Sequence, residues 1–257
     1  MIKLIVDLSE GQKQWEEFKE KKYSIALDGY VYGSTKFNDE SACANFNHHE
    51  ECDRLATRST CSQILLAVRT GLLNSFFNGK EIQVDVYVND CDQDVCLSWY
   101  ILSRHWRCKS VNNPLLNRLV FIEDLLDTFA GSYPFDINEP ILKEVAWIFA
   151  PYTMFRFSGG LERKNSEEYL SIVESVCDRI DKYLLGNGES LLLQTKYERV
   201  ETFNNFHLVK GIGRDYKMKL MSDGIEAYVA YRELANGNYS YTLGKMSPFI
   251  KFNIDKY

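Results

Sequence analysis

The chain lacks the segments that would place it in or across a membrane. No apolar run approaches the roughly 18–20 residues that a membrane-spanning helix needs, and Asp7 interrupts the apolar N-terminus too early for a signal peptide. Internal repeats and low-complexity segments are also missing. We therefore expect a cytoplasmic protein with no membrane partner, whose 257 residues form one large domain or two small ones.

The signatures of several common enzyme classes are missing as well. Gly-x-Ser-x-Gly, Walker-A and Gly-x-Gly-x-x-Gly patterns do not occur in a suitable context, so nothing supports a serine hydrolase, a P-loop NTPase or a Rossmann dinucleotide enzyme. The seven cysteines are scattered, and none forms the close pair typical of a structural zinc site, Cys91 and Cys96 being the nearest. Free thiols are the expected state, although Cys43, Cys52 and Cys61 flank a histidine pair.

Positive charge is in short supply. The chain has 30 lysines and arginines against 36 acidic residues, which gives a net charge of −6 and an isoelectric point near 5.4. Broad binding of nucleic acid needs a basic face, and this composition argues against one. A short nucleotide held by a few arginines and metal ions remains compatible with it. The apolar content of 45% is sufficient for a proper core.

Three carboxylates follow an apolar segment in the first half of the chain. Residues Val84–Val88 alternate and are β-branched or aromatic, which predicts a buried strand. Asp90, Asp92 and Asp94 come next, and the apolar run Val95–Leu102 predicts a helix. In open α/β sheets, ligands bind at the carboxyl ends of strands. Clustered carboxylates repel one another unless a cation neutralises them, so the pattern indicates a site for a hard divalent ion.

Two further strand ends carry possible metal ligands. Asp28 closes an apolar stretch, and His48 and His49 follow another probable strand. Each motif alone is more often a solvated turn or a surface feature, but neighbouring strands with these ends would converge on one cleft. Histidine together with several carboxylates suits Mn²⁺ better than Mg²⁺. We expect one or two such ions.

Two arginines lie next to the histidine pair. The apolar stripe of residues 54–77 predicts one long helix that begins directly after the histidines. Arg54 and Arg58 share a face of that helix, whose N-terminus favours anions such as phosphate. The alternative is that both arginines simply pair with nearby acidic residues, Glu50, Glu51 or Asp53.

These residues resemble the DHH phosphoesterase superfamily, which includes RecJ-like exonucleases, nano-RNA and cyclic-dinucleotide phosphodiesterases and family II pyrophosphatases. Asp90–Asp94 with Ser98 resembles the first motif of the superfamily, and Asn47-His48-His49 resembles its Asp-His-His motif with Asn in place of Asp. Asp28 resembles a single-Asp motif and Asp127 a fourth, later Asp. The motif order is permuted. The resemblance implies that Asn47 could still ligate a metal through its carbonyl oxygen.

The expected architecture follows from this resemblance and from a change in sequence pattern, from helical periodicity to alternation, along the chain. We expect an α/β, parallel-sheet DHH-like domain with helices on both faces over residues 1–150, and a smaller C-terminal α+β domain over residues 151–257. An amphipathic helix is predicted for residues 165–185. From residue 191 the sequence alternates, and Asn236-Gly237 predicts a hairpin turn.

The expected function is that of a metal-dependent phosphoesterase or nuclease. It would hydrolyse a phosphodiester or pyrophosphate bond in a small nucleotide or short oligonucleotide. His48 would act as a general acid or support the metal, and Arg54 and Arg58 would neutralise developing charge. The expected metal ligands are Asp28, His49, Asp90, Asp92, Asp94 and Asp127. Two alternatives stay open: a non-catalytic DHH-like module that binds a nucleotide or protein at a decayed site, and a metal hydrolase with a non-phosphate substrate.

Overall fold

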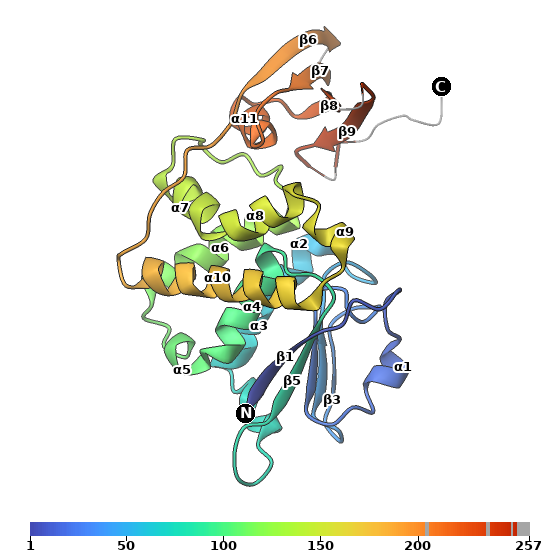
Figure 1. The fold of residues 1–257 in the computed structure, drawn as a ribbon, viewed down its shortest axis with the longest axis vertical. Helices are drawn as coiled ribbons and strands as arrows, with labels where there is room; N and C mark the ends of the chain where they lie inside the picture. The colour runs from blue at the N-terminus through green and yellow to red at the C-terminus, as the bar shows by residue number, and fades with distance from the viewer. Residues whose placement is uncertain (204–205, 235–236, 248, 251–257) are drawn as a thin grey trace. The chain divides into compact units, whose positions relative to one another are not determined.

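The computed structural model describes residues 1–203, 206–234, 237–247 and 249–250, and the chain divides into two compact units (Figure 1). The first unit comprises Met1–Asp124 and Trp147–Glu189, and the second comprises Leu125–Ala146 and Ser190–Tyr257. This division differs from the expected boundary between residues 150 and 151. The segment after residue 147 returns to the first unit because its long helix packs against that unit's sheet and helices.

The first unit is built on a sheet of five strands, four of them parallel. Strands β5, β2 and β4 are direct neighbours, so their carboxyl ends lie side by side at one edge of the sheet. Strand β3 is antiparallel to β4 at the outer edge. In spatial order the strands are β1 (Ile2–Val6), β5 (Val84–Val88), β2 (Ser24–Leu27), β4 (Cys43–Phe46) and β3 (Lys36–Asn38).

Helices cover the two faces of this sheet unequally. Helices α3 (Thr60–Arg69), α4 (Gln93–Ser103) and α10 (Ser166–Leu184) pack on one face. Among the described residues, only the short α1 (Trp15–Phe18) lies on the other face (Figure 1). Phe18 of α1 packs there against apolar side chains of β2 and β4. The strands β2 and β4 are buried along their whole length, as expected for parallel strands covered on both sides.

The prediction of one continuous helix over residues 54–77 is wrong, because this segment is divided into three shorter elements. It consists of α2 (Arg54–Thr57), α3 and a 3₁₀ turn, η1 (Leu72–Phe76). The break lies at Arg58, whose φ of 72° is incompatible with a right-handed helix. Ser59 then caps α3 by accepting a hydrogen bond from the amide of Ser62. The helix that approaches the histidine pair is therefore α3.

The other predicted helix is confirmed. Asn165 caps α10 by accepting a hydrogen bond from the amide of Glu167, and the buried side of the helix carries the expected apolar stripe. None of the helices in the part of the chain that the structure describes is long and apolar enough to cross a membrane. The remaining helices are α5 (His105–Cys108), α6 (Pro114–Thr128), α7 (Pro140–Ile148), α8 (Ala150–Phe157) and α9 (Gly160–Arg163).

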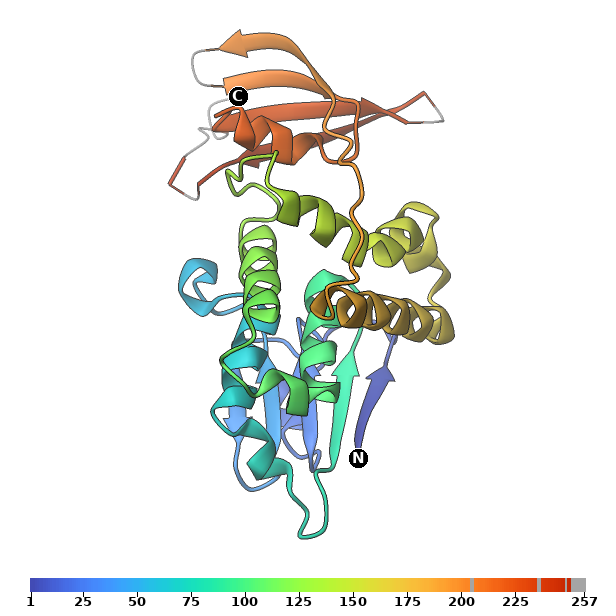
Figure 2. The ribbon, with the colours of Figure 1, turned by 90° about the vertical axis from the view of Figure 1, so that its left-hand side faces the viewer.

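The second unit contains a four-stranded sheet with one helix against a face (Figure 2). Tyr216 and Leu220 of α11 (Tyr216–Ser222) pack with Val209 and Tyr228 of the sheet. The antiparallel pairing of the last two strands agrees with the predicted hairpin, but Asn236 lies outside the described residues. The strand order is β6 (Tyr197–Phe203), β7 (Phe206–Gly211), β8 (Ala227–Glu233) and β9 (Tyr239–Lys245).

Candidate metal centre

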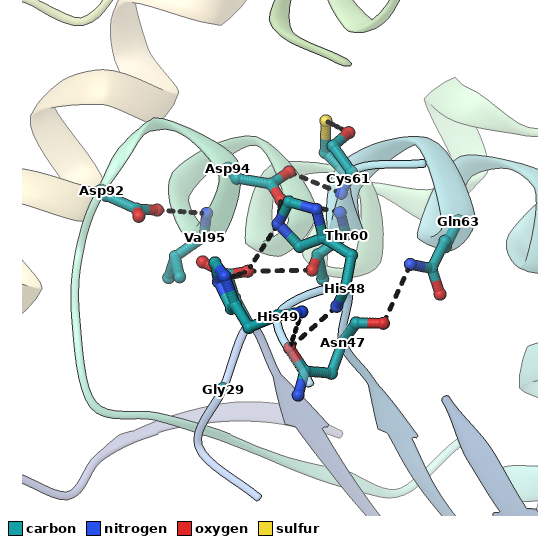
Figure 3. Close-up of polar contacts among 12 residues, drawn as sticks. Gly29, Asn47, His48, His49, Thr60, Cys61, Gln63, Asp92, Asp94 and Val95 are labelled. Carbon is teal, nitrogen blue, oxygen red and sulfur yellow. Dashed lines mark hydrogen bonds and ion pairs between the residues drawn. The ribbon is translucent and has the colours of Figure 1, made fainter. Parts of the chain in front are cut away.

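Three strand ends meet at the carboxyl edge of the first unit's sheet (Figure 3). Asp28 directly follows β2, His48 and His49 follow β4, and Asp92 follows β5 before α4 begins. Because these three strands are adjacent and parallel, their ends are brought together as the sequence predicted. The expected convergence of a single Asp, a histidine pair and an Asp-rich segment is therefore present.

The ligand-type atoms of Asp28, His48 and His49 all lie within 4.8 Å of one another, and we call these three residues the Asp28 cluster. His49 Nε2 lies 2.9 Å from Asp28 Oδ1, and His48 Nε2 lies 3.4 Å from the same oxygen. The Thr60 hydroxyl donates a third hydrogen bond to it, at 3.1 Å. Two imidazoles and a carboxylate that face one point are a donor set suited to a divalent transition-metal ion.

The backbone around Asp28 explains how this side chain reaches the histidines. Asp28 itself has a φ of 49° and Gly29 a φ of 80°, so the chain turns sharply as soon as β2 ends. Aspartate tolerates the left-handed region better than most residues. Gly29 also allows a close approach, because a Cβ added there would lie 3.3 Å from His49 Cδ2.

Asp94 links the Asp28 cluster to the N-terminus of α3. Its two carboxylate oxygens accept hydrogen bonds from the amides of Thr60, at 2.7 Å, and Cys61, at 2.6 Å. The first amides of α3 thus bind the carboxylate of Asp94, whereas the helix end that the sequence assigned to phosphate, at Arg54, is the start of α2. His48 Nε2 lies 3.8 Å from Asp94 Oδ2, so Asp94 also adds negative charge beside the histidine.

Asp90 and Asp92 surround the cluster rather than joining it. Asp92 Oδ1 caps α4 by accepting from the amide of Val95 at 2.9 Å, and Asp90 Oδ1 accepts from the next amide in the chain at 2.6 Å. Burial, followed by the charges of Asp28, Asp90 and Asp94, raises the pKa of Asp92 well above its ordinary value. Burial also raises the pKa of Asp90. The charged forms of both carboxyl groups are therefore disfavoured at this place, and a bound cation would favour them.

Hydrogen bonds between the members of the Asp28 cluster shift the pKa values of Asp28 and His49 in opposite directions. Burial raises the pKa of Asp28, but the hydrogen bonds from His48 and His49 outweigh it and bring that pKa below its ordinary value. The hydrogen bond to Asp28 in turn raises the pKa of His49, against the effect of burial. Both shifts favour the charged forms of Asp28 and His49 beside each other.

Asn47 does not have the ligand role that the resemblance implied. Its Oδ1 accepts hydrogen bonds from the backbone amides of His48, at 2.8 Å, and His49, at 3.1 Å (Figure 3). The side chain is fully buried. Its carbonyl oxygen is occupied by the histidine backbone, so ligation of a metal by Asn47 is not part of this arrangement.

The two arginines differ in their surroundings. Arg58 forms an ion pair with Asp124, with 2.5 Å between Nη2 and Oδ2, so its positive charge is already neutralised within the first unit. The partner is a different carboxylate from the three considered in the sequence. Arg54 remains near the cluster, since its charge lowers the pKa of His49. Asp127, the sixth ligand expected from the sequence, belongs to the part of α6 that groups with the second unit and is therefore not one of the first-unit residues of the site.

Sequence reasoning missed three contributors to this site. The Thr60 hydroxyl contacts Asp28, and the serine cap just before it is the only sequence signal that marks its position. Arg156 of α8 lies close enough to lower the pKa of Asp90, and the charge of Asp90 is one cause of the raised pKa of Tyr152 on the same helix. No local pattern relates α8 to a strand end some 60 residues earlier.

Comparison with known proteins finds no match. No family model, curated protein or solved structure matches this chain.

Proposed function

We propose that this protein is a phosphoesterase that depends on a divalent metal ion, with Mn²⁺ as the preferred ion. The observation that carries the proposal is the Asp28 cluster, in which one carboxylate and two imidazoles face a common point at the carboxyl ends of parallel strands. Ligand sites of open α/β sheets are found at such edges. The excess of carboxylates around the cluster supports a cation in particular, because a bound cation would offset their mutual repulsion.

The donor set assigns distinct roles to the residues of the site. Asp28, His48 and His49 would hold the ion, and Asp94 would lie beside it while it caps α3. The side chain of His48 is fully buried, which favours a ligand role over the general-acid role expected from the sequence. A bound Mn²⁺ supplies Lewis-acid polarisation of a phosphoryl oxygen and a water molecule acidic enough to attack phosphorus.

The phosphorylated substrate is inferred from the motif resemblance together with the positive charge near the site. Arg54 lies close to His49, and Arg156 lies close to Asp90, so an anionic substrate would meet two cations at the border of the carboxylate cluster. Substrates of this class are short oligonucleotides, cyclic dinucleotides, pyrophosphate and nucleoside phosphates. Arg58 is no longer included in this role because Asp124 neutralises it.

The test is an activity screen with a metal-binding control. The purified protein, stripped with EDTA and reloaded with Mn²⁺, Mg²⁺ or Zn²⁺, is assayed on the four substrate classes. We expect turnover of at least one of them with Mn²⁺ and none after EDTA treatment. An Asp181→Asn variant serves as a matched control, because Asp181 is a partly buried carboxylate of the same unit that binds Arg104 and Arg107.

A second candidate function is a non-catalytic module that binds a nucleotide at this edge. It is favoured by two observations: Asn47 provides no ligand, and Arg58 is paired with Asp124. This candidate predicts tight binding of a metal or a nucleotide, measured by calorimetry, with no turnover of any substrate in the screen. Absence of metal binding, of nucleotide binding and of turnover would refute both candidates.

A further inference from the structure

Both polar groups of the Asn47 side chain form hydrogen bonds. Acceptors surround its Nδ2, and backbone N–H donors surround its Oδ1. The Nδ2 group donates to the carbonyl of Gly33 at 2.9 Å and to Glu50 Oε2 at 2.6 Å, with a longer contact to the carbonyl of Val31 at 3.4 Å. All three partners are acceptors. The amide can therefore adopt only this orientation, with its nitrogen toward Glu50 and its oxygen toward the histidines.

The oxygen of the same amide fixes two successive backbone groups. Oδ1 accepts from the amides of both His48 and His49. In an extended chain, consecutive side chains point to opposite sides of the backbone. Here His48 Nε2 and His49 Nε2 both reach Asp28 Oδ1, and the centres of the two rings are 4.4 Å apart. The chain must turn after Asn47 to allow this, and an asparagine oxygen that bridges two following amides stabilises such a turn.

The backbone of Asn47 is also fixed. Its amide donates to the hydroxyl of Thr35 at 3.1 Å, and its carbonyl accepts from Gln63 Nε2 of α3 at 3.3 Å. Glu50, which receives the Asn47 amide, is itself held by Gln12 Nε2 at 2.9 Å. The turn that carries both histidines is thus connected to the loop after β2 and to the helix that bears Thr60.

We propose that Asn47 is a positioning residue for the histidine pair. Its neutral amide is required for this role because Nδ2 donates hydrogen bonds that an aspartate could not make. This proposal rests on the proposed function, in which both histidines hold a metal ion. An aspartate at position 47 would keep the oxygen toward the histidine amides. Its second oxygen, however, would face two carbonyl oxygens and the carboxylate of Glu50 at the distance where Nδ2 now donates. Like charges at such a distance repel strongly.

The proposal predicts a result opposite to that expected for a ligand. If residue 47 bound the metal, Asn47→Asp would add a charged ligand and tighten binding. If Asn47 is a positioning residue, the substitution Asn47→Asp should instead weaken Mn²⁺ binding by about 10-fold or more. This is the usual effect of disturbing a group that orients a metal ligand. The measurement is a Mn²⁺ titration of the metal-free protein by calorimetry, repeated with electron paramagnetic resonance of free Mn²⁺.

A charge-restoring double variant distinguishes positioning from general damage. In Asn47→Asp with Glu50→Gln, the glutamine amide donates to the new carboxylate, so the contact between the two side chains regains one donor and one acceptor. We expect most of the lost Mn²⁺ affinity to return. Glu50→Gln alone should change the affinity by less than about threefold, because the Asn47 amide can still donate to the oxygen of glutamine. A double variant no better than Asn47→Asp would overturn the proposal.

Asn45→Asp provides the matched control. Asn45 is fully buried on β4, the strand that Asn47 follows, and its Nδ2 donates to the carbonyls of Gly33 and Ser34. Its oxygen does not bind the histidine amides. The chemical change and the burial are the same as at position 47. We expect Asn45→Asp to lower the free energy of unfolding in urea while Mn²⁺ affinity of the folded protein is retained. An equal loss of affinity in both variants would show that position 47 has no particular positioning role.

Hydrogen exchange of the metal-free protein tests the inference separately from the proposed function. The amides of His48 and His49 should be protected in the wild type because Asn47 Oδ1 accepts from both, and this protection should be lost in Asn47→Ala while the amides of β5 stay protected. Unprotected histidine amides in the wild type would refute the positioning role, whatever the metal result. Protected amides together with no metal binding by the wild type would refute the proposed function and the metal-related part of the inference, and leave only a local structural role.

Discussion

Replacing Asp28 by asparagine removes the carboxylate that both histidines of the Asp28 cluster contact. The exchange preserves the shape of the side chain, and asparagine tolerates the left-handed backbone at this position, where φ is 49°. The remaining amide oxygen can still accept from Thr60, which lies 3.1 Å away. The main change is therefore the loss of one negative charge next to His48 and His49.

The size of the effect follows from the charge that is lost. Two unit charges about 4 Å apart interact by about 4 kcal/mol at an effective dielectric constant of about 20. Since about 1.4 kcal/mol corresponds to a factor of ten, Asp28→Asn should weaken Mn²⁺ binding by about 10³-fold. The metal-free variant should also melt at a lower temperature. The pKa of Asp28 is below its ordinary value in the folded protein, so the fold favours the charged form that asparagine cannot adopt.

The assay is a calorimetric Mn²⁺ titration of the wild type, Asp28→Asn and the control Asp181→Asn, with circular dichroism to verify folding. Asp181 accepts hydrogen bonds from Tyr100 and Arg107, and its loss should reduce stability without changing Mn²⁺ affinity. If Asp28→Asn binds Mn²⁺ within about threefold of the wild type, Asp28 is not a metal ligand and the reasoning fails. An equal loss of affinity in Asp181→Asn would point to a general loss of structure instead.

Three further predictions concern stability. Millimolar Mn²⁺ should raise the melting temperature, because a ligand that binds only the folded state stabilises it, by about 2.7 kcal/mol at 100 times its Kd; the absence of any shift with Mn²⁺, Mg²⁺ or Zn²⁺ would count against a metal site. Asp92→Asn should stabilise the metal-free protein, which is the opposite of the effect expected for Asp28→Asn. Burial and neighbouring charges raise the pKa of Asp92, so the fold disfavours its charged form, and asparagine can still cap α4. A lower melting temperature of Asp92→Asn would contradict this. Hydrogen bonds from Ser9 and Tyr30 lower the pKa of Asp7 from 3.8 to about 2, so this contribution to stability is complete above pH 3.8 and is lost as the pH falls through 2. Tyr30→Phe should therefore cost about 1 kcal/mol in urea unfolding at pH 7 and progressively less below pH 3.8, and a difference independent of pH would refute this role of Asp7.

The strand ends of the site could be predicted because their signals are local. The alternation of Val84–Val88 and the apolar stretch before Asp28 mark strands by their own composition. Once the strands are taken as parallel neighbours, their ends must share one edge, so the meeting of Asp28 with His48 and His49 follows without further information. The helix of residues 166–184 was predictable for the same reason, since its apolar stripe lies within the helix.

The roles of individual residues within the site could not be predicted in this way. Arg58 interrupts the predicted helix with a φ of 72°, and its ion pair is with Asp124 of α6, a residue distant in sequence. The oxygen of Asn47 could face either an ion or two backbone amides, and only the turn of the chain decides between them. The approach of Arg156 to Asp90 depends on α8, a helix far along the chain.

The division of the chain into two units also could not be predicted from local sequence patterns. The sequence places a boundary near Pro151, where an apolar helix pattern is interrupted. The structure instead returns residues 147–189 to the first unit, because α10 buries its apolar stripe against α4 and β1. Amphipathic periodicity indicates that a helix has a buried face, but it does not indicate which other elements pack against that face.

By itself, the sequence determined the strands that lead to Asp28, His48 and Asp90, the acidic and histidine-bearing ends of these strands, and the long amphipathic helix, since each depends on residues within a few positions of one another. Tertiary structure alone decided the pairing order of the strands, the helix N-terminus that Asp94 caps, and the turn by which Asn47 directs both histidines toward Asp28. These contacts join residues that are distant in sequence, or fix one of several conformations that a short segment can adopt. Their free energy depends on burial and on the partners that packing supplies, which a local pattern does not contain.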